Sequence, residues 1–444
     1  MNKLIYIGGA LSAALILGVA WHAKAADLGG NCCGDLEERV AELEATTARK
    51  GNRKVSLSIS GYVSHSIMAW DDGGQKDIYI GDGGASSSRF RIKGDAKISA
   101  DLTAGFLYEF GINNNALGTM NQGAGGDDLG GAVALRDSTV WLRHKSLGMV
   151  KIGHGSTATD NLILVDLSGA SAAMTPDAAL YNGGFGTRLS SLTINGTPIP
   201  AVSGLLTPIT WGQVINGGIS FDTARRNHVL YETPTLAGFT VAAAVAENSF
   251  WDVGLKYAGE FSGIRVAFGV GRSVDKEVPA FGLFGLTARE ISEWKGSASV
   301  LHTQTGLFLN AAGGQREINW AVNLGGGHTL SAKDPRFWHV TAGWSKNVFG
   351  MGSTILFAEY MRADDFVGYS LGGPSINGSV TSDTRMWGIG VVQSIDAAAL
   401  DVFLTHKRYE TDLNLSGTGG GGSLTIDAQM YDFSATVAGV RIQF

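Results

Sequence analysis

The sequence predicts an all-β fold, a 16-stranded antiparallel transmembrane β-barrel preceded by a short N-terminal periplasmic helix. The chain is rich in glycine, with 64 among 444 residues, and charged residues make up 17% where roughly 25% is usual. Beyond residue 25, no stretch approaches the roughly 18 apolar residues that a membrane helix needs. Many short segments instead alternate apolar and polar residues, as the strands of a barrel in lipid do.

The N-terminus has the features of an export signal. Lys3 precedes an apolar run over residues 4–20, and residues 23–25 read Ala-Lys-Ala, a small-residue cleavage site. We therefore expect residues 1–25 to be a cleaved signal peptide. The apolar run is slightly long for such a signal, so an uncleaved membrane anchor is the alternative.

Residues 26–53 are expected to form a periplasmic N-terminal segment. Within it, Leu36, Val40, Leu43 and Thr47 recur at spacings of four, three and four on a charged stretch. This is heptad spacing, and it predicts a helix that forms a coiled coil in a trimer. Two heptads are marginal alone, so the alternative is an amphipathic helix lying on another surface.

Two adjacent cysteines, Cys32 and Cys33, precede this helix and lie outside every predicted strand. They provide no internal disulfide framework. One interpretation is disulfides between subunits in the periplasmic stalk, and the other is an incidental pair.

The barrel is predicted to occupy residues 54–444, because from Lys54 onward apolar and polar residues alternate with a period of two. The second predicted strand, 89–98, is the clearest, with Phe90 and Ile92 on one face and Arg89, Arg91 and Lys93 on the other. A soluble sandwich would not bury such a basic face. One face must therefore meet lipid and the other water.

The same alternation predicts sixteen strands, an even number that returns both termini to the periplasm. Their connections alternate between tight turns and long loops, except for a short fourth loop near Asn248. Phe444 ends the last strand and resembles the C-terminal aromatic signal that barrel-assembly machinery recognises. The strands are expected near residues 54–69, 89–98, 102–111, 133–145, 148–154, 226–234, 237–246, 250–258, 263–271, 292–303, 306–312, 336–345, 352–361, 384–395, 398–409 and 427–444.

Several segments resemble alphaproteobacterial porins of the Rhizobiales type. These are the start ADLGGNCCGDLEERVAELEATTARKGNRKVSLSISGYV and the later segments RDSTVWLRHKSLGMVKIGH, RRNHVLYETPTLAGF and GVVQSIDAAALDVFL. The resemblance spans the barrel but not the loops. It implies a homotrimer in the outer membrane of a Gram-negative bacterium, passive diffusion of small hydrophilic solutes, and a third loop that folds inward and narrows each pore.

Residues 155–225 form the predicted third loop, which is far longer than ordinary connections and is expected to fold partly into the pore. It would bring Asp160, Asp166 and Asp177 toward the wall, although these acids suit surface turns as well. Facing rows of opposite charge create a transverse field that selects solutes. The predicted basic row is Arg89, Arg91, Lys93, Arg143 and Lys151, each of which has the alternative role of keeping the wall wet.

No nucleophile elbow, zinc-binding helix, Walker loop or dinucleotide fingerprint occurs, so we expect no enzyme activity and no cofactor. Turn chemistry explains acid-glycine clusters such as residues 71–74, so we expect no metal site; the alternative is that they bind divalent cations that bridge lipopolysaccharide. Removing residues 1–25 takes away Lys3 and Lys24 and no acids, so the mature chain would have 32 basic and 40 acidic residues and a formal net charge of −8. This charge indicates a mild cation preference, although the constriction sets selectivity.

The expected partners are further copies of this chain, outer-membrane lipid and lipopolysaccharide, and peptidoglycan through the N-terminus; no nucleic acid is expected. Two other functions remain as alternatives to general diffusion. A solute-specific channel would line its path with dedicated binding residues, and a structural or adhesive barrel would have a plugged lumen.

Overall fold

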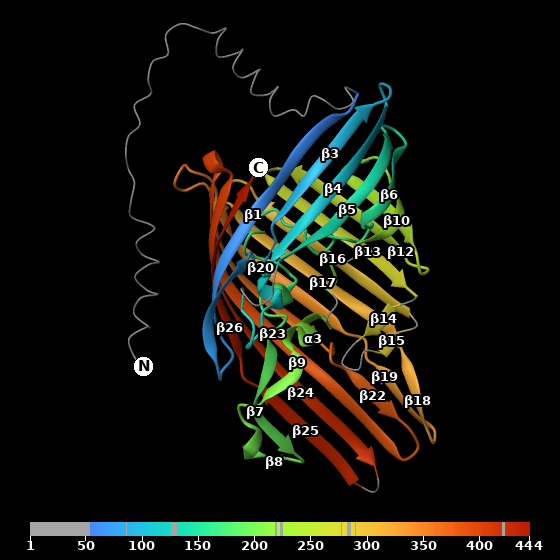
Figure 1. Ribbon diagram of the computed structural model, residues 1–444, viewed down its shortest axis with the longest axis vertical. Helices are drawn as coiled ribbons and strands as arrows, with labels where there is room; N and C mark the ends of the chain where they lie inside the picture. The colour runs from blue at the N-terminus through green and yellow to red at the C-terminus, as the bar shows by residue number, and fades with distance from the viewer. Residues whose placement is uncertain are drawn as a thin grey trace. The chain divides into compact units, whose positions relative to one another are not determined.

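A closed barrel of sixteen antiparallel strands dominates the computed structural model (Figure 1). The structure describes residues 54–444 except 86, 126–130, 218–219, 223–224, 277, 282–285, 289 and 420–421. The predicted signal peptide, cysteine pair and coiled coil therefore lie outside the described residues. The barrel strands are β1 (Ser56–Asp71), β3 (Arg89–Lys97), β4 (Leu102–Asn114), β5 (Gly131–His144), β6 (Gly148–Ser156), β10 (Arg225–Glu232), β11 (Phe239–Ala246), β12 (Trp251–Phe261), β13 (Ile264–Asp275), β16 (Glu290–His302), β17 (Leu307–Asn319), β20 (Arg336–Lys346), β21 (Thr354–Asp364), β23 (Ile376–Ile395), β24 (Leu400–Gly419) and β26 (Phe433–Gln443).

Each barrel strand pairs with the next one along the chain, and β26 pairs with β1 from Tyr62↔Gln443 to Asp71↔Ser434. This pairing closes the sheet, so every strand has a neighbour on both sides. A closed barrel satisfies all of its backbone groups between strands, which is the condition for crossing lipid without helices.

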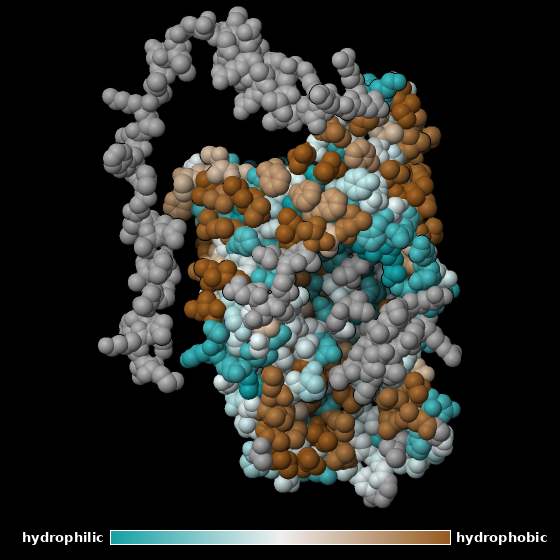
Figure 2. Space-filling model, in the orientation of Figure 1, coloured by the Kyte–Doolittle hydropathy of each residue, from teal (hydrophilic) through white to brown (hydrophobic). Residues whose placement is uncertain are grey.

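Side chains alternate across the wall as the sequence predicts. On β1, Ser64, Ser66 and Met68 point inward and are buried, whereas Val63 and Ile67 point outward and are exposed. Figure 2 shows hydrophobic residues over the upper part of one face and hydrophilic residues below them around the middle of the molecule. The exposed apolar side chains form the surface that meets lipid.

Several segments that were expected to be loops form additional strands. The expected loop over residues 410–426 is wrong, because β24 continues to Gly419 and returns as β25 (Gly422–Met430). The predicted strand 427–444 joins the end of β25 to β26, which begins only at Phe433. The strands of this hairpin stay hydrogen-bonded beyond the membrane surface, where lipid no longer imposes an alternation of apolar and polar residues. The other additional strands are β2 (Lys76–Asp82), β7 (Gly186–Ile194), β8 (Thr197–Pro198), β9 (Leu206–Thr210), β14 (Val278–Phe281), β15 (Leu286–Ala288), β18 (Ala321–Gly325), β19 (His328–Ala332) and β22 (Tyr369–Gly372).

Helical structure is scarce in the described residues. It consists of the helix α3 (Trp211–Asn216) and the short 3₁₀ turns η1 (Leu117–Thr119), η3 (Ala178–Leu180), η4 (Pro200–Val202) and η5 (Asp396–Ala398). None of the helices in this part of the chain is long and apolar enough to cross a membrane.

The third loop, residues 157–224 between β6 and β10, is named L3 below. Its middle part forms a hairpin of β7 and β9, and β7 pairs with β25 of the last loop. The parts on either side pack within the barrel through aromatic residues. The ring centroids of Phe185 and Phe433 are 4.8 Å apart, and those of Trp211 and Tyr409 are 5.9 Å apart. Such pairs each contribute about 0.5–1.5 kcal/mol beyond the area that they bury.

Candidate functional site: a charged constriction inside the barrel

L3 begins at a buried carboxylate on the barrel wall. Asp252 of β12 accepts hydrogen bonds from Thr157 Oγ1 (2.5 Å), Ala158 N (3.2 Å), Thr159 N (2.8 Å) and Thr159 Oγ1 (2.7 Å). Only 1% of Asp252 is exposed. Four donors from three consecutive residues therefore converge on one side chain, and this holds the start of L3 against β12.

Two inward-facing glycines allow this close approach. A Cβ atom at Gly254 of β12 would lie 2.5 Å from the carbonyl oxygen of Ala158, and one at Gly271 of β13 would lie 2.6 Å from Cδ1 of Leu162. Real Cβ atoms do not pack this closely, so a larger residue at Gly254 would displace the backbone of L3, and one at Gly271 would force the side chain of Leu162 to move. The high glycine content thus has a specific use on this part of the wall.

The next part of L3 follows β16 and β17. Ser297 Oγ donates to the carbonyl of Leu162 (2.6 Å) and accepts from Val165 N (3.1 Å), while Ser299 Oγ accepts from Leu167 N (2.9 Å). Asn310 Nδ2 donates to Asp166 Oδ1 at 2.8 Å. The Oδ2 atom of Asp166 has no hydrogen-bond partner among the described residues.

L3 returns to the wall at a second buried ionic group. Lys295 Nζ donates to the carbonyl of Phe221 (2.8 Å), and Arg316 Nη1 donates to that of Asn216 (3.3 Å). Both cations also contact Glu293, with Arg316 Nη2 at 2.6 Å and Lys295 Nζ at 3.3 Å from its carboxylate. The wall therefore anchors L3 at both ends.

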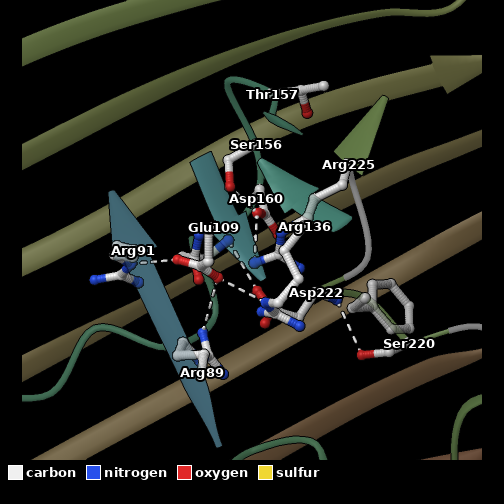
Figure 3. Close-up of polar contacts among 12 residues, drawn as sticks. Arg89, Arg91, Glu109, Arg136, Ser156, Thr157, Asp160, Ser220, Asp222 and Arg225 are labelled. Atoms are coloured by element: carbon white, nitrogen blue, oxygen red, sulfur yellow. Dashed lines mark hydrogen bonds and ion pairs between the residues drawn. The ribbon is translucent and has the colours of Figure 1, made fainter. Parts of the chain in front are cut away.

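A cluster of arginines surrounds one carboxylate on the β3–β5 wall. Arg89, Arg91 and Arg136 approach Glu109 of β4 from three sides (Figure 3). Arg89 Nη1 lies 3.4 Å and Arg136 Nε 2.6 Å from Glu109 Oε1, and Arg91 Nε contacts Oε2. Three positive charges share one negative charge, so the cluster keeps an excess of positive charge while its guanidinium groups are held in place.

Arg136 reaches this cluster because β5 has an irregular register. Glu109 pairs with Asp137, but the next residue, Phe110, pairs with Leu135, so Arg136 is an extra residue opposite the break. A bulge of this kind redirects a side chain. Strict alternation would put Arg136 on the lipid side, and for this reason the sequence did not identify it.

Arg441 of β26 extends the basic surface. Its Nη2 lies 2.8 Å from Asp401 Oδ2, and its guanidinium lies 3.5 Å from Ser171 Oγ of L3. Arg89 and Arg441 both lie over the ring of Tyr62, with Cζ 5.0 Å and 5.7 Å from its centroid. Alternation with the outward Val440 and Ile442 was a signal that would have identified Arg441.

These side chains and L3 enclose a cavity of about 270 Å³ inside the barrel. Arg89, Arg91 and Arg441 line it on one side, and Asp166 lines it from L3. The remaining lining residues are mostly neutral: Tyr62, Ala85, Ile163, Leu164, Val165, Ser171, Met174, Thr175, Pro176, Ser297, Asn310, Ala311, Ala312 and His339. The lining thus combines basic groups of β3 and β26 with one acidic group of L3.

The other predicted basic residues are not among those that line this cavity. Lys93 pairs with Asp95 at 3.0 Å and lies over the ring of Trp141. Arg143 Nη2 lies 3.2 Å from Met149 Sδ, and Lys151 Nζ donates to the carbonyl of Ser156 at 2.7 Å. Of the five predicted basic residues, the structure thus brings only Arg89 and Arg91 together at the cavity.

Two of the three predicted acids also have other surroundings. Asp160 is buried, accepts a hydrogen bond from Ser156 Oγ, and pairs with Arg225 at 3.3 Å. Asp177 accepts a hydrogen bond from Asn216 Nδ2 at 3.2 Å, and burial raises the pKa of its carboxyl above the usual value. Of the three predicted acids, only Asp166 is among the residues that line the cavity.

The C-terminal residue, Phe444, completes the edge of β1. Its nitrogen donates to the carbonyl of Gly61 at 3.0 Å, and its carbonyl accepts from Gly61 N at 2.9 Å. Its side chain is 61% exposed. The assembly role of this aromatic residue stays a prediction.

The base of L3 contains a proton-binding carboxyl group. Asp222 accepts a hydrogen bond from Asn161 N at 2.8 Å, and Asp160 and Arg225 lie beside it (Figure 3). Burial, followed by repulsion from Asp160 and Asp177, raises the pKa of Asp222 to about 7, whereas Arg225 lowers it. The folded chain therefore binds this proton over a pH range in which the unfolded chain has lost it.

Raising the pH from about 5.5 to about 8.5 is expected to loosen the base of L3. Because the folded pKa is raised, the stability from this group falls between about pH 4 and pH 7 and then stays constant. Proteolysis of L3 should be faster at the higher pH, and Asp222→Asn, digested in parallel at each pH as the control, should abolish the difference. A wild-type cleavage rate that follows the variant's at both pH values would contradict this expectation.

Comparisons with known proteins add three findings. Residues 10–414 match a family model described as Gram-negative porin. OmpT of Vibrio cholerae, folded in vitro, is 12% identical, with 89% of this chain and 99% of that chain covered and a TM-score of 0.51. An anion-selective porin from Comamonas acidovorans is 16% identical, with coverages of 88% and 100% and a TM-score of 0.51. No curated protein sequence matches the chain significantly.

Proposed function

Because this chain belongs to the Gram-negative porin family, a family of outer-membrane channels, we propose that its barrel narrows at the constriction between L3 and the arginines of β3 and β26. The channel is water-filled and lets small hydrophilic solutes and ions diffuse across the outer membrane. The observation that supports this constriction is the small cavity that Arg89, Arg91 and Arg441 share with Asp166.

The constriction favours anions over cations. Three arginines and one aspartate line the cavity, and Glu109 neutralises only part of the charge of its three arginine neighbours. Charges at the narrowest point decide selectivity, while the total charge of the chain acts over a longer, screened distance. This proposal replaces the mild cation preference that the net charge indicates.

Passive transport without turnover is part of the same proposal. The charged side chains at the constriction are paired with one another or with side chains of L3, as in the contacts of Arg91 with Glu109 and of Arg441 with Asp401 and the hydroxyl of Ser171. Such groups orient water and solutes and need no chemical step. No enzyme activity is proposed.

Single-channel recording in planar bilayers tests the function directly. A general-diffusion channel should show stable open steps, a moderate excess of anion permeability, and no saturable block by any single sugar, amino acid or phosphate. Saturable block by one solute would favour a solute-specific channel instead. Electrical silence of a correctly folded barrel would contradict the proposal.

We also infer that three copies of the chain associate through the β3–β6 side of the barrel. The outward positions that the structure describes on these strands contain no Asp, Glu, Lys or Arg, and Val140 and Ile152 are more than half exposed there. A structure of Vibrio cholerae OmpT, which is 13% identical with a TM-score of 0.50, is described as a trimer form.

Unboiled protein should therefore migrate as a larger species than boiled protein on a detergent gel. Val140→Arg should convert the unboiled species to a folded monomer. The matched control is Val253→Arg on β12, since both substitutions place a charge toward lipid at a cost of roughly 2–4 kcal/mol or less. Equal behaviour of the two variants would remove the β3–β6 side as the interface.

The N-terminal part of the proposal rests on the sequence. The segments quoted above support an alphaproteobacterial, Rhizobiales-type origin, a cleaved signal at residues 1–25, and a periplasmic stalk at residues 26–53 that contacts peptidoglycan or helps assembly. Deleting residues 27–50 should leave single-channel conductance nearly unchanged and weaken trimer stability or retention by cell-wall sacculi. Altered conductance with both associations intact would assign the segment to the pore.

A further inference from the structure

Four arginines form a row on the outer surface of the barrel, one on each of four successive strands. They are Arg336 of β20, Arg362 of β21, Arg385 of β23 and Arg408 of β24, and this set is named the outer arginine row. Each side chain is at least 41% exposed, whereas the neighbouring inward residues Phe337, Met361, Met386 and Lys407 are buried. The row therefore faces away from the lumen.

The row keeps one height around the barrel. In the register of neighbouring strands, Arg336 stands opposite Asp364, which lies two residues beyond Arg362. Arg385 likewise stands opposite Glu410, two residues beyond Arg408. Arg362 and Arg385 stand directly opposite each other in the register of β21 and β23. Strands in a barrel are tilted, so side chains at the same depth in the membrane must step along successive strands in this way.

Aromatic residues lie next to the row, on its periplasmic side. Trp338, Tyr360 and Trp387 point outward and are each about two-fifths exposed, and the rings of Trp338 and Tyr360 are 5.3 Å apart. Aromatic belts mark the level of lipid headgroups. The outer arginine row thus lies at the headgroups of the outer leaflet.

A hollow in the apolar wall lies farther toward the periplasmic side than these aromatic residues. It has a volume of about 770 Å³ and is lined by apolar side chains that include Leu356, Ile389 and Leu404. Gly343 and Gly390 also line it, and the buried rings of Phe308 and Phe357 pack against these two glycines. Its size suits hydrocarbon chains that lie along the wall.

Carboxylates hold the arginines along the surface without occupying all of their donors. Arg362 Nε contacts Asp364 at 2.9 Å and its Nη2 contacts Asp383 at 2.6 Å; Arg385 Nε contacts Asp383 at 3.0 Å. A guanidinium group has five N–H donors, so each keeps donors for another anion. Guanidinium groups bind phosphate oxygens in a bidentate manner.

We infer that the outer arginine row and the hollow below it form a binding site for a phosphorylated glycolipid of the outer leaflet. The arginines bind the phosphate groups, the aromatic residues lie at the sugar level, and the hollow takes an acyl chain. The uncharged β3–β6 side lies elsewhere on the barrel, so the lipid and the partner subunits use different surfaces. The inference rests on the outer-membrane location and not on the constriction, and its failure would leave the proposed function intact.

The test measures binding of bisphosphorylated lipid A to the purified barrel in detergent by native mass spectrometry. Replacing all four arginines of the row by glutamine should weaken binding by roughly tenfold or more. Arg265→Gln is the matched control, because Arg265 is also exposed and paired with a carboxylate, Glu260 at 2.9 Å, but lies at a periplasmic turn. A second variant, Ala358→Phe, should weaken binding by filling the hollow while the arginines remain.

Lipid A without its phosphates should bind the wild type as weakly as bisphosphorylated lipid A binds the fourfold variant. Equal binding of both lipids, or of both proteins, would overturn the inference. Binding of inorganic phosphate as tightly as lipid A would assign the site to a free anion instead. Heat modifiability and unchanged conductance verify folding, and loss of the oligomer in the fourfold variant would make the row a subunit contact and overturn the lipid assignment.

Discussion

Replacing Arg89 and Arg91 together by glutamine is expected to increase the permeability of potassium relative to chloride by roughly fivefold. Both side chains line the cavity. A unit charge about 7 Å from a passing ion in a water-like medium changes the energy of that ion by about 0.6 kcal/mol, and salt screening reduces this by somewhat more than half. Two charges that act in opposite directions on potassium and chloride then change the permeability ratio by about 1 kcal/mol, or roughly fivefold. Arg136 remains to pair with Glu109 at 2.6 Å, so the carboxylate is not left alone. Reversal potentials in a salt gradient measure the ratio.

Lys93→Gln is the matched control for this experiment. It removes one positive charge from the same strand, but Lys93 pairs with Asp95 and is not among the residues that line the cavity. We expect the permeability ratio of this variant to stay close to that of the wild type. An unchanged ratio in the double variant, or an equal change in the control, would place the selective point elsewhere in the barrel.

Replacing Asp252 by alanine is expected to release the start of L3 and to raise the single-channel conductance roughly twofold, with increased current noise. The substitution leaves two backbone N–H groups and two hydroxyl groups of Thr157, Ala158 and Thr159 without their acceptor. Each unsatisfied buried group costs about 1–3 kcal/mol. The position of L3 against β12 should therefore lose much of its free-energy advantage over positions in which the loop is released.

Asp252→Asn separates loss of the anchor from loss of the charge. The amide keeps one oxygen acceptor of the same shape, so its conductance should lie between those of the wild type and the alanine variant. Limited proteolysis of L3 should follow the same order. Wild-type conductance and protection of L3 in a folded Asp252→Ala barrel would show that the β12 anchor does not hold the loop.

The sequence predicted the barrel well because alternation has a direct physical cause. Lipid faces one side of each strand and water the other, so the sixteen strands and the inward face of Arg89 and Arg91 follow from a period of two. Where pairing continued beyond the membrane, the same period no longer separated strand from loop. The expected loop over residues 410–426 was wrong for this reason.

The constriction was harder to predict because it depends on contacts between distant segments. Nothing in the local sequence shows that Asp252 accepts four hydrogen bonds from L3, or that Asp177 faces α3 and not the opening. The inward position of Arg136 depends on a bulge in β5, and a bulge breaks the alternation from which the inward and outward faces of a strand are assigned. Arg441, in contrast, lies on a regular strand and could have been identified.

The most direct test of the account is thiol labelling of Asp166→Cys in open channels, in a chain whose Cys32 and Cys33 are serine. Asp166 lines the same cavity as Arg89, Arg91 and Arg441, so attachment of a bulky charged methanethiosulfonate reagent should reduce the conductance by roughly half or more. Ser423→Cys on the exposed hairpin of β24 and β25 is the control and should show no change after labelling. A conductance that stays constant after complete labelling of Cys at position 166 would contradict the claim that L3 and the arginines form the constriction.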